Sequence, residues 1–309
     1  MLGVSQPTET VASPVRGDAV VRGIAYMIAS TIGFAGVNAL IKWEVALYPV
    51  GEVAFFRSLF SLIPCAIIVL PRHGFPVLRT GRVGDHVRRA LSQTCSMTAI
   101  FLAFKLMPLA SAIAISFSAP LFTTLLSVLL LKEKVGIHRW SALGVGFAGV
   151  LMVTDPGAGS LGLGALFALV NALLISTVAI AIRRMSTTET TETLLIYQLL
   201  LLTVFTAALL PFGFTLPGPF DLSLLAVAGM LNGVAQYWWT KSLHLAPASA
   251  VVPFNYLSLV WATIVGFIVW GDVPTPALMA GSTVVVGSGL YILWRESGER
   301  RRLAARGAT

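Results

Sequence analysis

The sequence predicts an all-α membrane protein of ten transmembrane helices, arranged as two inverted five-helix repeats with both termini in the cytoplasm. Three observations lead to this prediction: ten apolar stretches, a similarity between the first five and the last five, and a concentration of basic residues in alternate connectors. The 309 residues are 56% hydrophobic and only 11% charged. Soluble domains carry roughly 25% charged residues, so the bilayer must act as solvent for this chain.

The predicted spans follow one another closely, and their connectors contain the turn-forming residues Pro, Gly and Asp. We expect a cytoplasmic tail over 1–21, a first repeat over 22–154, a second and inverted repeat over 161–295, and a basic cytoplasmic tail over 296–309. The ten spans are 22–43, 51–70, 89–107, 109–131, 139–154, 161–182, 193–212, 221–243, 247–270 and 276–295.

Orientation follows from the positions of lysine and arginine, which collect in cytoplasmic connectors. Of the 21 basic residues, only Lys42, Arg57 and Lys105 fall outside one set of alternate connectors and the two tails. Both termini are therefore predicted to be cytoplasmic, which requires an even number of spans.

The internal repeat is visible in two matching segments, Phe104 to Ala112 and Thr240 to Ala250. Each closes the third span of its half and opens the fourth through a very short connection. The charge bias places Lys105 outside and Lys241 inside, as an inverted repeat requires. Inverted repeats are the architecture of alternating-access transporters.

Residues 22–295 resemble the drug/metabolite transporter superfamily, in particular its ten-helix exporters built from two EamA-type repeats. The resemblance implies export of small metabolites, often amino acids, and within the family the chain is most similar to YddG-type exporters of aromatic amino acids. It rests on Asn38…Lys42, Glu52…Arg57, Lys105…Pro108…Ala112, Pro120-Leu121-Phe122, Leu131-Lys132-Glu133, Lys241…Ser249-Ala250 and Asp272.

Polar residues of the first two spans are the first candidates for substrate binding, because such residues are costly in lipid. Arg57 is either a clamp for a substrate carboxylate or a structural charge that pairs with Glu52 or reaches a headgroup. Asn38 and Lys42 are four residues apart and share a helix face, where an amide and an ammonium suit a zwitterion. Alternatively, Lys42 extends to the membrane surface.

Later spans supply further amides and aromatic rings. An amide exposed to lipid is penalised, so these amides are expected to face protein or water, and rings beside them suit an aromatic ligand. The alternative for the aromatic residues is an interfacial belt. The predicted substrate-binding residues beyond the first two spans are Gln93, Asn171, Tyr197, Asn232, Gln236, Tyr237, Asn255, Tyr256 and Trp261.

Two prolines occupy equivalent positions in the fourth and ninth spans, Pro120 and Pro253. Each removes a helical hydrogen bond, which favours either a gating hinge or a fixed bend. The fifth span contains Gly144-Val145-Gly146-Phe147-Ala148-Gly149. This run matches a dinucleotide fingerprint but lies inside an apolar span, so it predicts close helix packing within the scaffold or a dimer contact.

The chain lacks a nucleotide-binding G-x-x-x-x-G-K-[ST] motif, which favours a secondary transporter. No carboxylate or histidine is predicted near the midplane, so we expect facilitated diffusion or weakly coupled export. We predict no catalysis, metal, cofactor or nucleic-acid partner, and a monomer or weak dimer in the lipid of a bacterial inner membrane. The alternatives are a carrier of drugs, nucleotide sugars or phosphate esters, an intramembrane enzyme, and a channel.

Overall fold

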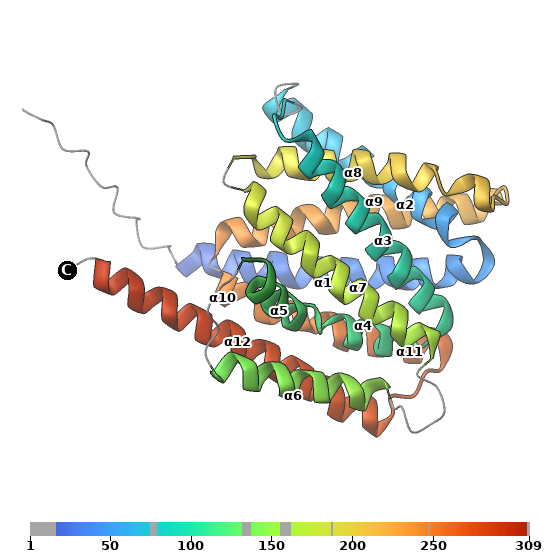
Figure 1. Ribbon diagram of the computed structural model, residues 1–309. Coiled ribbons are helices and arrows are strands. Elements are labelled where there is room, and N and C mark those ends of the chain that lie inside the picture. The colour runs from blue at the N-terminus through green and yellow to red at the C-terminus, as the bar shows by residue number, and fades with distance from the viewer. Residues whose placement is uncertain are drawn as a thin grey trace, which may run out of the picture.

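The computed structural model describes residues 17–74, 79–131, 137–154, 162–186, 188–246 and 248–307. Over these ranges the chain forms helices and no strand, which confirms the all-α prediction (Figure 1). The helices of the first half are α1 (Gly17–Leu47), α2 (Val50–His73), α3 (Val83–Leu106), α4 (Leu109–Ser116), α5 (Ala119–Leu131) and α6 (Ile137–Thr154). Those of the second half are α7 (Leu163–Met185), α8 (Thr191–Ala207), η3 (Leu210–Phe212), α9 (Pro219–Leu245), α10 (Ala248–Val251), η4 (Val252–Tyr256), α11 (Leu257–Trp270) and α12 (Pro276–Gly307).

Six helical stretches within the described ranges are long and apolar enough to cross a bilayer. The apolar parts of α6 and α12 are shorter, and α3 and α9 are less apolar than the six. Helices α3 and α9 carry polar groups that neighbouring helices cover. Helix α9 packs against α1 and α2, and α3 packs against α7 and α8. The six stretches are Asp18–Leu47, Val50–Val69, Leu109–Leu129, Leu163–Ile182, Thr191–Phe212 and Val252–Trp270.

The fourth and ninth spans are broken rather than continuous. In the fourth, α4 ends at Ser116, a turn follows, and Pro120 is the second residue of α5. In the ninth, Pro253 lies in the short helix η4 that precedes α11. Proline has no N–H to donate, so it is tolerated in the first turn of a helix and ends the helix before it. The two breaks meet, because the Phe117 and Tyr256 rings lie 4.8 Å apart.

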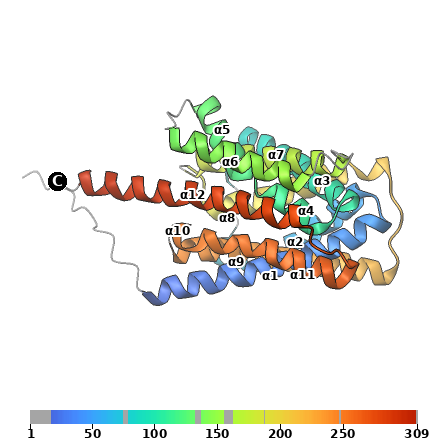
Figure 2. The same ribbon diagram turned by 90° about the horizontal axis from the view of Figure 1, so that it is seen from below.

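Glycines bring α6 and α12 into backbone contact. A Cβ added at Gly149 would lie 2.9 Å from the carbonyl oxygen of Gly281, and one added at Gly281 would lie 2.6 Å from that of Gly149. The glycine-rich fifth span therefore serves helix packing in the scaffold, as predicted. Figure 2 shows this pair beside two layers, one containing α3, α5 and α7 and the other α1, α9, α10 and α11.

The two ends of the bundle are packed differently. We call the end where α1 begins and α12 finishes the terminal end, and the opposite end the distal end (Figure 1). The largest apolar core draws on ten helices, α1 to α4, α6 to α9, α11 and α12, and gathers at the distal end around residues such as Ile41, Phe104 and Leu109. The terminal end holds three small clusters, around Leu121, Met27 and Val69, and none of them joins the two layers of Figure 2.

Candidate functional site

Arg57 places a guanidinium inside the bundle. Its Nη2 donates to Oδ1 of Asn232 at 2.6 Å, its Nη1 lies 2.7 Å from the sulfur of Met97, and its guanidinium carbon lies 5.6 Å from the centre of the Phe101 ring. Its Nε has no hydrogen-bond partner. The pairing with Glu52 that the sequence left open is not formed, because Glu52 accepts a hydrogen bond from the backbone N–H of Thr215 instead. No ion pair joins Arg57 to an acid within the described ranges.

Close approach of α2 and α9 makes the Arg57–Asn232 contact possible. A Cβ at Gly229 would lie 2.8 Å from the carbonyl oxygen of Arg57, so a larger residue would push the helices apart. The Asn232 amide is also fixed on its other side, where its Nδ2 donates to the Ser61 hydroxyl at 3.0 Å. Asn232 therefore holds the Arg57 guanidinium in place without neutralising it.

Asn38 lies at about the same depth as Arg57. Gly33 of α1 packs on Ala235 of α9 and Gly36 packs on Leu231, so the two helices are antiparallel and Asn38 falls near the level of Gly229. The Asn38 amide is partly exposed and makes no hydrogen bond with described residues. A free amide at the depth of an unneutralised guanidinium is what a carboxylate-bearing ligand requires.

Lys42, one turn further along α1, is already engaged. Its Nζ donates to the carbonyl oxygens of Phe104 at 3.1 Å and Met107 at 2.7 Å, and it lies 5.3 Å from the centre of a Trp270 ring. A cation at a helix C-terminus satisfies carbonyls that lack partners and interacts favourably with the helix dipole. Lys42 thus fastens the distal end of α3, and its ammonium is not free for a zwitterion beside Asn38.

Both ends of the Asn171 amide on α7 are bonded within the protein. Its Oδ1 accepts from the Ser96 hydroxyl on α3 at 2.8 Å, and its Nδ2 donates to the Ser116 hydroxyl on α4 at 3.1 Å. These bonds cross-link three helices at the middle of the bundle. The geometry therefore supports a structural role for this predicted site residue.

A cavity of about 330 Å³ opens at the terminal end among α3, α7, α8 and α9, and we call it the vestibule. Buried Arg89 forms part of its wall, where Nη1 donates to Oε1 of Gln198 at 3.0 Å and Nη2 to the carbonyl oxygen of Leu194 at 2.7 Å. Gln236 lines the vestibule with an amide that makes no hydrogen bond among the described residues. Tyr237 instead borders a smaller apolar pocket with Cys65 and Leu199.

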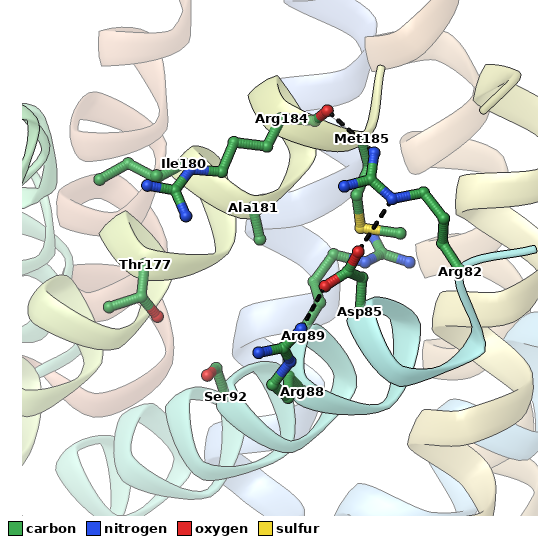
Figure 3. Close-up of a pocket in the computed structure, with 10 residues that line it drawn as sticks. All are labelled: Arg82, Asp85, Arg88, Arg89, Ser92, Thr177, Ile180, Ala181, Arg184 and Met185. Atoms are coloured by element: carbon green, nitrogen blue, oxygen red, sulfur yellow. Dashed lines mark hydrogen bonds and ion pairs between the residues drawn. The ribbon is translucent and has the colours of Figure 1, made fainter. Parts of the chain in front are cut away.

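A second terminal-end cavity of about 260 Å³ lies in the groove between α3 and α7 (Figure 3). It shares Arg89 with the vestibule but is otherwise lined by different residues, three of which are arginines. Neither of these two cavities is lined by residues of the distal apolar core, so both lie at the terminal end.

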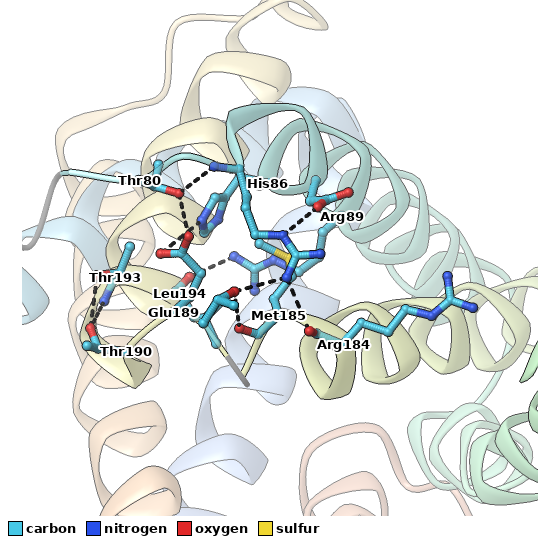
Figure 4. Close-up of polar contacts among 12 residues, drawn as sticks. Thr80, His86, Arg89, Arg184, Met185, Glu189, Thr190, Thr193 and Leu194 are labelled. Carbon is cyan, nitrogen blue, oxygen red and sulfur yellow. Dashed lines mark hydrogen bonds and ion pairs between the residues drawn. The ribbon is translucent and has the colours of Figure 1, made fainter.

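Polar contacts join α3 to the connector between α7 and α8, and we call this set the latch: Thr80, Arg82, His86, Thr188 and Glu189 (Figure 4). The Thr80 hydroxyl donates to Glu189 at 2.6 Å, and Arg82 donates to the Thr188 hydroxyl at 3.0 Å. Nε2 of His86 lies 4.0 Å from the Glu189 carboxylate. The latch connects the first half of the chain to the second at an end where the described buried apolar residues form three small clusters rather than one large core.

Of the remaining predicted residues, some contact other side chains of the protein and others are partly exposed. Tyr197 stacks on the His86 ring at 4.5 Å, and Trp261 Nε1 donates to the Thr31 hydroxyl at 3.2 Å. Tyr256 is buried, and its hydroxyl abuts Gly289 of α12. Gln93 and Asn255 are partly exposed and make no hydrogen bond with described residues.

A family model decides the identity. The EamA-like transporter family model matches the chain twice, over 21–155 and 162–294. The chain belongs to the EamA-like transporter family. It is a multi-pass inner-membrane transporter, and the double match fits a protein with two repeats.

Curated relatives of this EamA protein are bacterial transporters that it matches over nearly their whole length. It is 29% identical to a riboflavin transporter of Rhizobium johnstonii over 91% of this chain and 94% of the relative. It is 26% identical to an S-adenosylmethionine uptake transporter of Rickettsia felis, over 89% and 93%. A pseudopaline exporter of Pseudomonas aeruginosa is also 26% identical, over 85% and 93%.

A solved crystal structure shares the fold of the EamA protein. It aligns with a TM-score of 0.58 over 84% of this chain and 94% of its own, at 20% sequence identity. The named relatives do not include an aromatic amino-acid exporter, so the family and the transport activity are shown while the substrate is open to proposal.

Sequence reasoning missed several residues that the EamA bundle places around Arg57 and the vestibule. Three of them, Ser96, Ser116 and Gln198, are polar residues within spans, but residue type alone does not distinguish a site residue from one bonded within the bundle. Arg89 was counted only as a topology charge, although Arg89, Gln93 and Ser96 recur at helical spacing and share one face of α3. The residues missed are Ser61, Arg89, Ser96, Met97, Phe101, Ser116 and Gln198.

Proposed function

We propose that this EamA protein is a secondary transporter for a small amino acid or amino-acid-derived metabolite that carries an aromatic ring, bound at a central site beside Arg57. The observation that carries the proposal is the Arg57 guanidinium, which has a neutral amide, a sulfur atom and an aromatic face for neighbours. An unpaired charge inside a membrane protein is costly and is usually functional. A substrate carboxylate would supply the missing partner, and Phe101 would offer a ring face.

The relatives support the aromatic part of the substrate. Riboflavin and S-adenosylmethionine, named for two of them, both contain fused aromatic rings. The two arginines support an acidic group on the substrate. The deep guanidinium of Arg57 and that of Arg89 in the vestibule would both attract an anionic group. Aromatic amino acids are the simplest molecules that carry both features, and we propose them as the preferred class.

Alternating access is proposed from the unequal ends of the bundle. The packed distal end and the terminal-end vestibule correspond to a transporter open on one side. If the basic connectors mark the cytoplasm, this side is cytoplasmic and the two repeats are inverted. Transport would require the distal core to separate, with Pro120 and Pro253 as hinges at the breaks that meet through Phe117 and Tyr256.

We propose facilitated diffusion or weakly coupled export. Among the residues that the structure describes at the depth of Arg57, the polar neighbours are amides and hydroxyls rather than carboxylates or histidines. The buried acids Glu44 and Glu52 belong to the last turn of α1 and the first turn of α2, at the distal end. Flux of the substrate should therefore change little when a pH gradient is imposed at a fixed substrate gradient.

The test is uptake of labelled tryptophan into liposomes that contain the purified protein. Wild-type flux should saturate, should be competed by phenylalanine and should not be competed by tryptamine, which lacks the carboxylate. Arg57→Gln should lower the flux about 10- to 150-fold, the loss of a hydrogen bond to a charged group, while Arg57→Lys retains part of it. Arg22→Gln, an exposed change at the terminal end, is the control for charge and reconstitution.

Three results would contradict parts of this proposal. Equal flux through Arg57→Gln and wild type would exclude Arg57 as the anchor. Competition by tryptamine as strong as by phenylalanine would exclude recognition of the carboxylate. Saturable flux of riboflavin or S-adenosylmethionine without flux of any amino acid would replace the substrate class and leave the transporter family intact.

A further inference from the structure

The cavity between α3 and α7 lies apart from the proposed transport site. Its lining comes from two helices, and the side chains drawn in Figure 3 converge on it from α3 below and α7 above. Its volume, about 260 Å³, is ample for a phosphodiester headgroup. The residues that line it are Arg82, Asp85, Arg88, Arg89, Ser92, Thr177, Ile180, Ala181, Arg184 and Met185.

The lining has a strong excess of positive charge. Arg82, Arg88 and Arg184 line it beside a single acid, Asp85. The guanidinium of Arg89 is bonded to Gln198 and Leu194 on the vestibule side. Asp85 accepts from Arg82 at 2.9 Å and from Arg88 at 2.5 Å, and these arginines hold the pKa of its carboxyl below its usual range. Asp85 thus holds the Arg82 and Arg88 guanidinium groups at the cavity, whose lining carries more positive than negative charge.

The groove faces lipid rather than the vestibule. Ser96 of α3 donates to Asn171 of α7, and Arg82 donates to the backbone carbonyl of Arg184. These two contacts show that α3 and α7 are antiparallel. Cys95 and Leu173 therefore lie at similar depth. Along α3, Arg88 is followed at helical spacing by Leu91 and Cys95, which are exposed. In a membrane protein, an exposed apolar face contacts acyl chains.

The facing side of α7 continues the same surface. Below Arg184 and Thr177, the side chains of Leu173 and Val170 are exposed, at 38% and 37% of their surface. The opposite side of α7 points inward, where Ile182 and Ser186 line the vestibule. A basic cavity is therefore continuous with an apolar groove that runs toward the membrane centre.

We propose that this groove binds an anionic phospholipid. The phosphate would lie among Arg82, Arg88 and Arg184 with the Ser92 hydroxyl as a further donor, and an acyl chain would follow the exposed faces of α3 and α7. Basic pockets between helices recognise anionic headgroups, and guanidinium groups pair with phosphate oxygens. The apolar continuation favours a lipid over a free phosphate compound, because only a lipid uses both parts. The site is independent of the proposed substrate.

The test is native mass spectrometry of the purified full chain titrated with phosphatidylglycerol or with phosphatidylcholine. The wild-type protein should retain phosphatidylglycerol preferentially, and millimolar inorganic phosphate should not displace it. Each arginine removed should weaken binding about fivefold, so Arg88→Gln with Arg184→Gln should weaken it about 25-fold. Arg22→Gln makes the same charge change on α1 at the same end and should leave this binding unchanged.

Variants that unfold are recognised by thermal unfolding, and Arg88→Lys with Arg184→Lys keeps the charge if the glutamine pair is unstable. Equal retention of the two lipids by the wild-type protein would overturn the proposal without any variant. Full displacement by inorganic phosphate would also overturn it, and would assign the cavity to a soluble anion. Tryptophan flux that is absent while lipid selectivity persists would contradict only the transport proposal.

Discussion

The distal and terminal ends of this EamA protein are built from the same helices but are held together by different means. At the distal end, side chains from both halves interlock in one apolar core, and Lys42 fastens the end of α3. At the terminal end, the buried apolar residues that the structure describes form three small, separate clusters, and the hydrogen bonds of the latch add further contacts between the halves beside two cavities.

The difference shows where this fold can open. Lipid is as apolar as a leucine side chain, so burial alone does not hold membrane helices together, and packing contacts and hydrogen bonds do. A continuous core must lose many packing contacts at once to separate, whereas a few exchangeable hydrogen bonds separate readily. The terminal end is thus the less tightly packed side in this structure, and under the alternating-access proposal the distal end is the side that would have to open.

The largest expected difference between the two ends is in the rate at which an introduced cysteine reacts with a soluble thiol reagent. In a variant without Cys65 and Cys95, Gln236→Cys should react with a soluble maleimide about 100-fold faster than Ile41→Cys. The reason is that Gln236 lines the vestibule, while reaching Ile41 requires a local opening of about 3 kcal/mol. Equal rates would contradict the description of one open end and one closed end. Substrate that accelerates labelling of Ile41→Cys would be direct support for alternating access.

The same Leu→Ala substitution should lower the free energy of unfolding by different amounts at the two ends. Leu109→Ala removes a fully buried side chain from the distal core and should lower the free energy of unfolding by about 2–5 kcal/mol, because it leaves an enclosed void. Leu194→Ala removes the same atoms beside the vestibule, where space already exists, and should cost about 2 kcal/mol, the low end of that range. Thermal and denaturant unfolding in detergent measure both. Similar losses would mean that the terminal end is packed as tightly as the distal end.

The fold was largely predictable from the sequence because each span has to bury its own backbone hydrogen bonds and cover its length with apolar residues. The breaks in the fourth and ninth spans were less predictable. Pro120 and Pro253 marked where each helix weakens, but only the neighbouring Phe117 and Tyr256 rings show that the two breaks meet.

The candidate site was predictable only in its residue types. A polar residue in a span indicates a partner without saying which one. Asn171 and Lys42 are satisfied by protein groups, whereas Asn38 is not, and nothing in their spacing distinguishes them. Arg57 remained ambiguous for the same reason, since Glu52 is close in sequence but bonds Thr215. Long-range helix contacts decide these cases, and local pattern does not encode them.

The smallest expected effect is a pH dependence of the latch. His86 lies before the predicted membrane segment that begins at residue 89, is fully buried, and stacks on Tyr197. Burial and nearby Arg89 lower the pKa of His86 below its usual 6.5, against the opposing pull of Glu189. The folded protein therefore binds this proton more weakly than the unfolded chain. Stability should be complete above about pH 6.5 and should fall as the pH drops below it.

His86→Phe keeps the stacking surface for Tyr197 and removes the titrating group, so it is the matched variant for this effect. The wild-type melting temperature should fall more steeply than that of His86→Phe between pH 6.5 and 5, with a slope difference of at most about 1.4 kcal/mol per pH unit. The same histidine is faced by Asp85, Arg82 and Glu189. The variant Glu189→Gln, measured in parallel, separates the titration of that carboxylate from the titration of His86. Parallel pH profiles for wild type and His86→Phe would show that the terminal end is not held by a neutral histidine. A steeper wild-type profile together with faster thiol labelling of Gln236→Cys in acid would place the loss of stability at the latch.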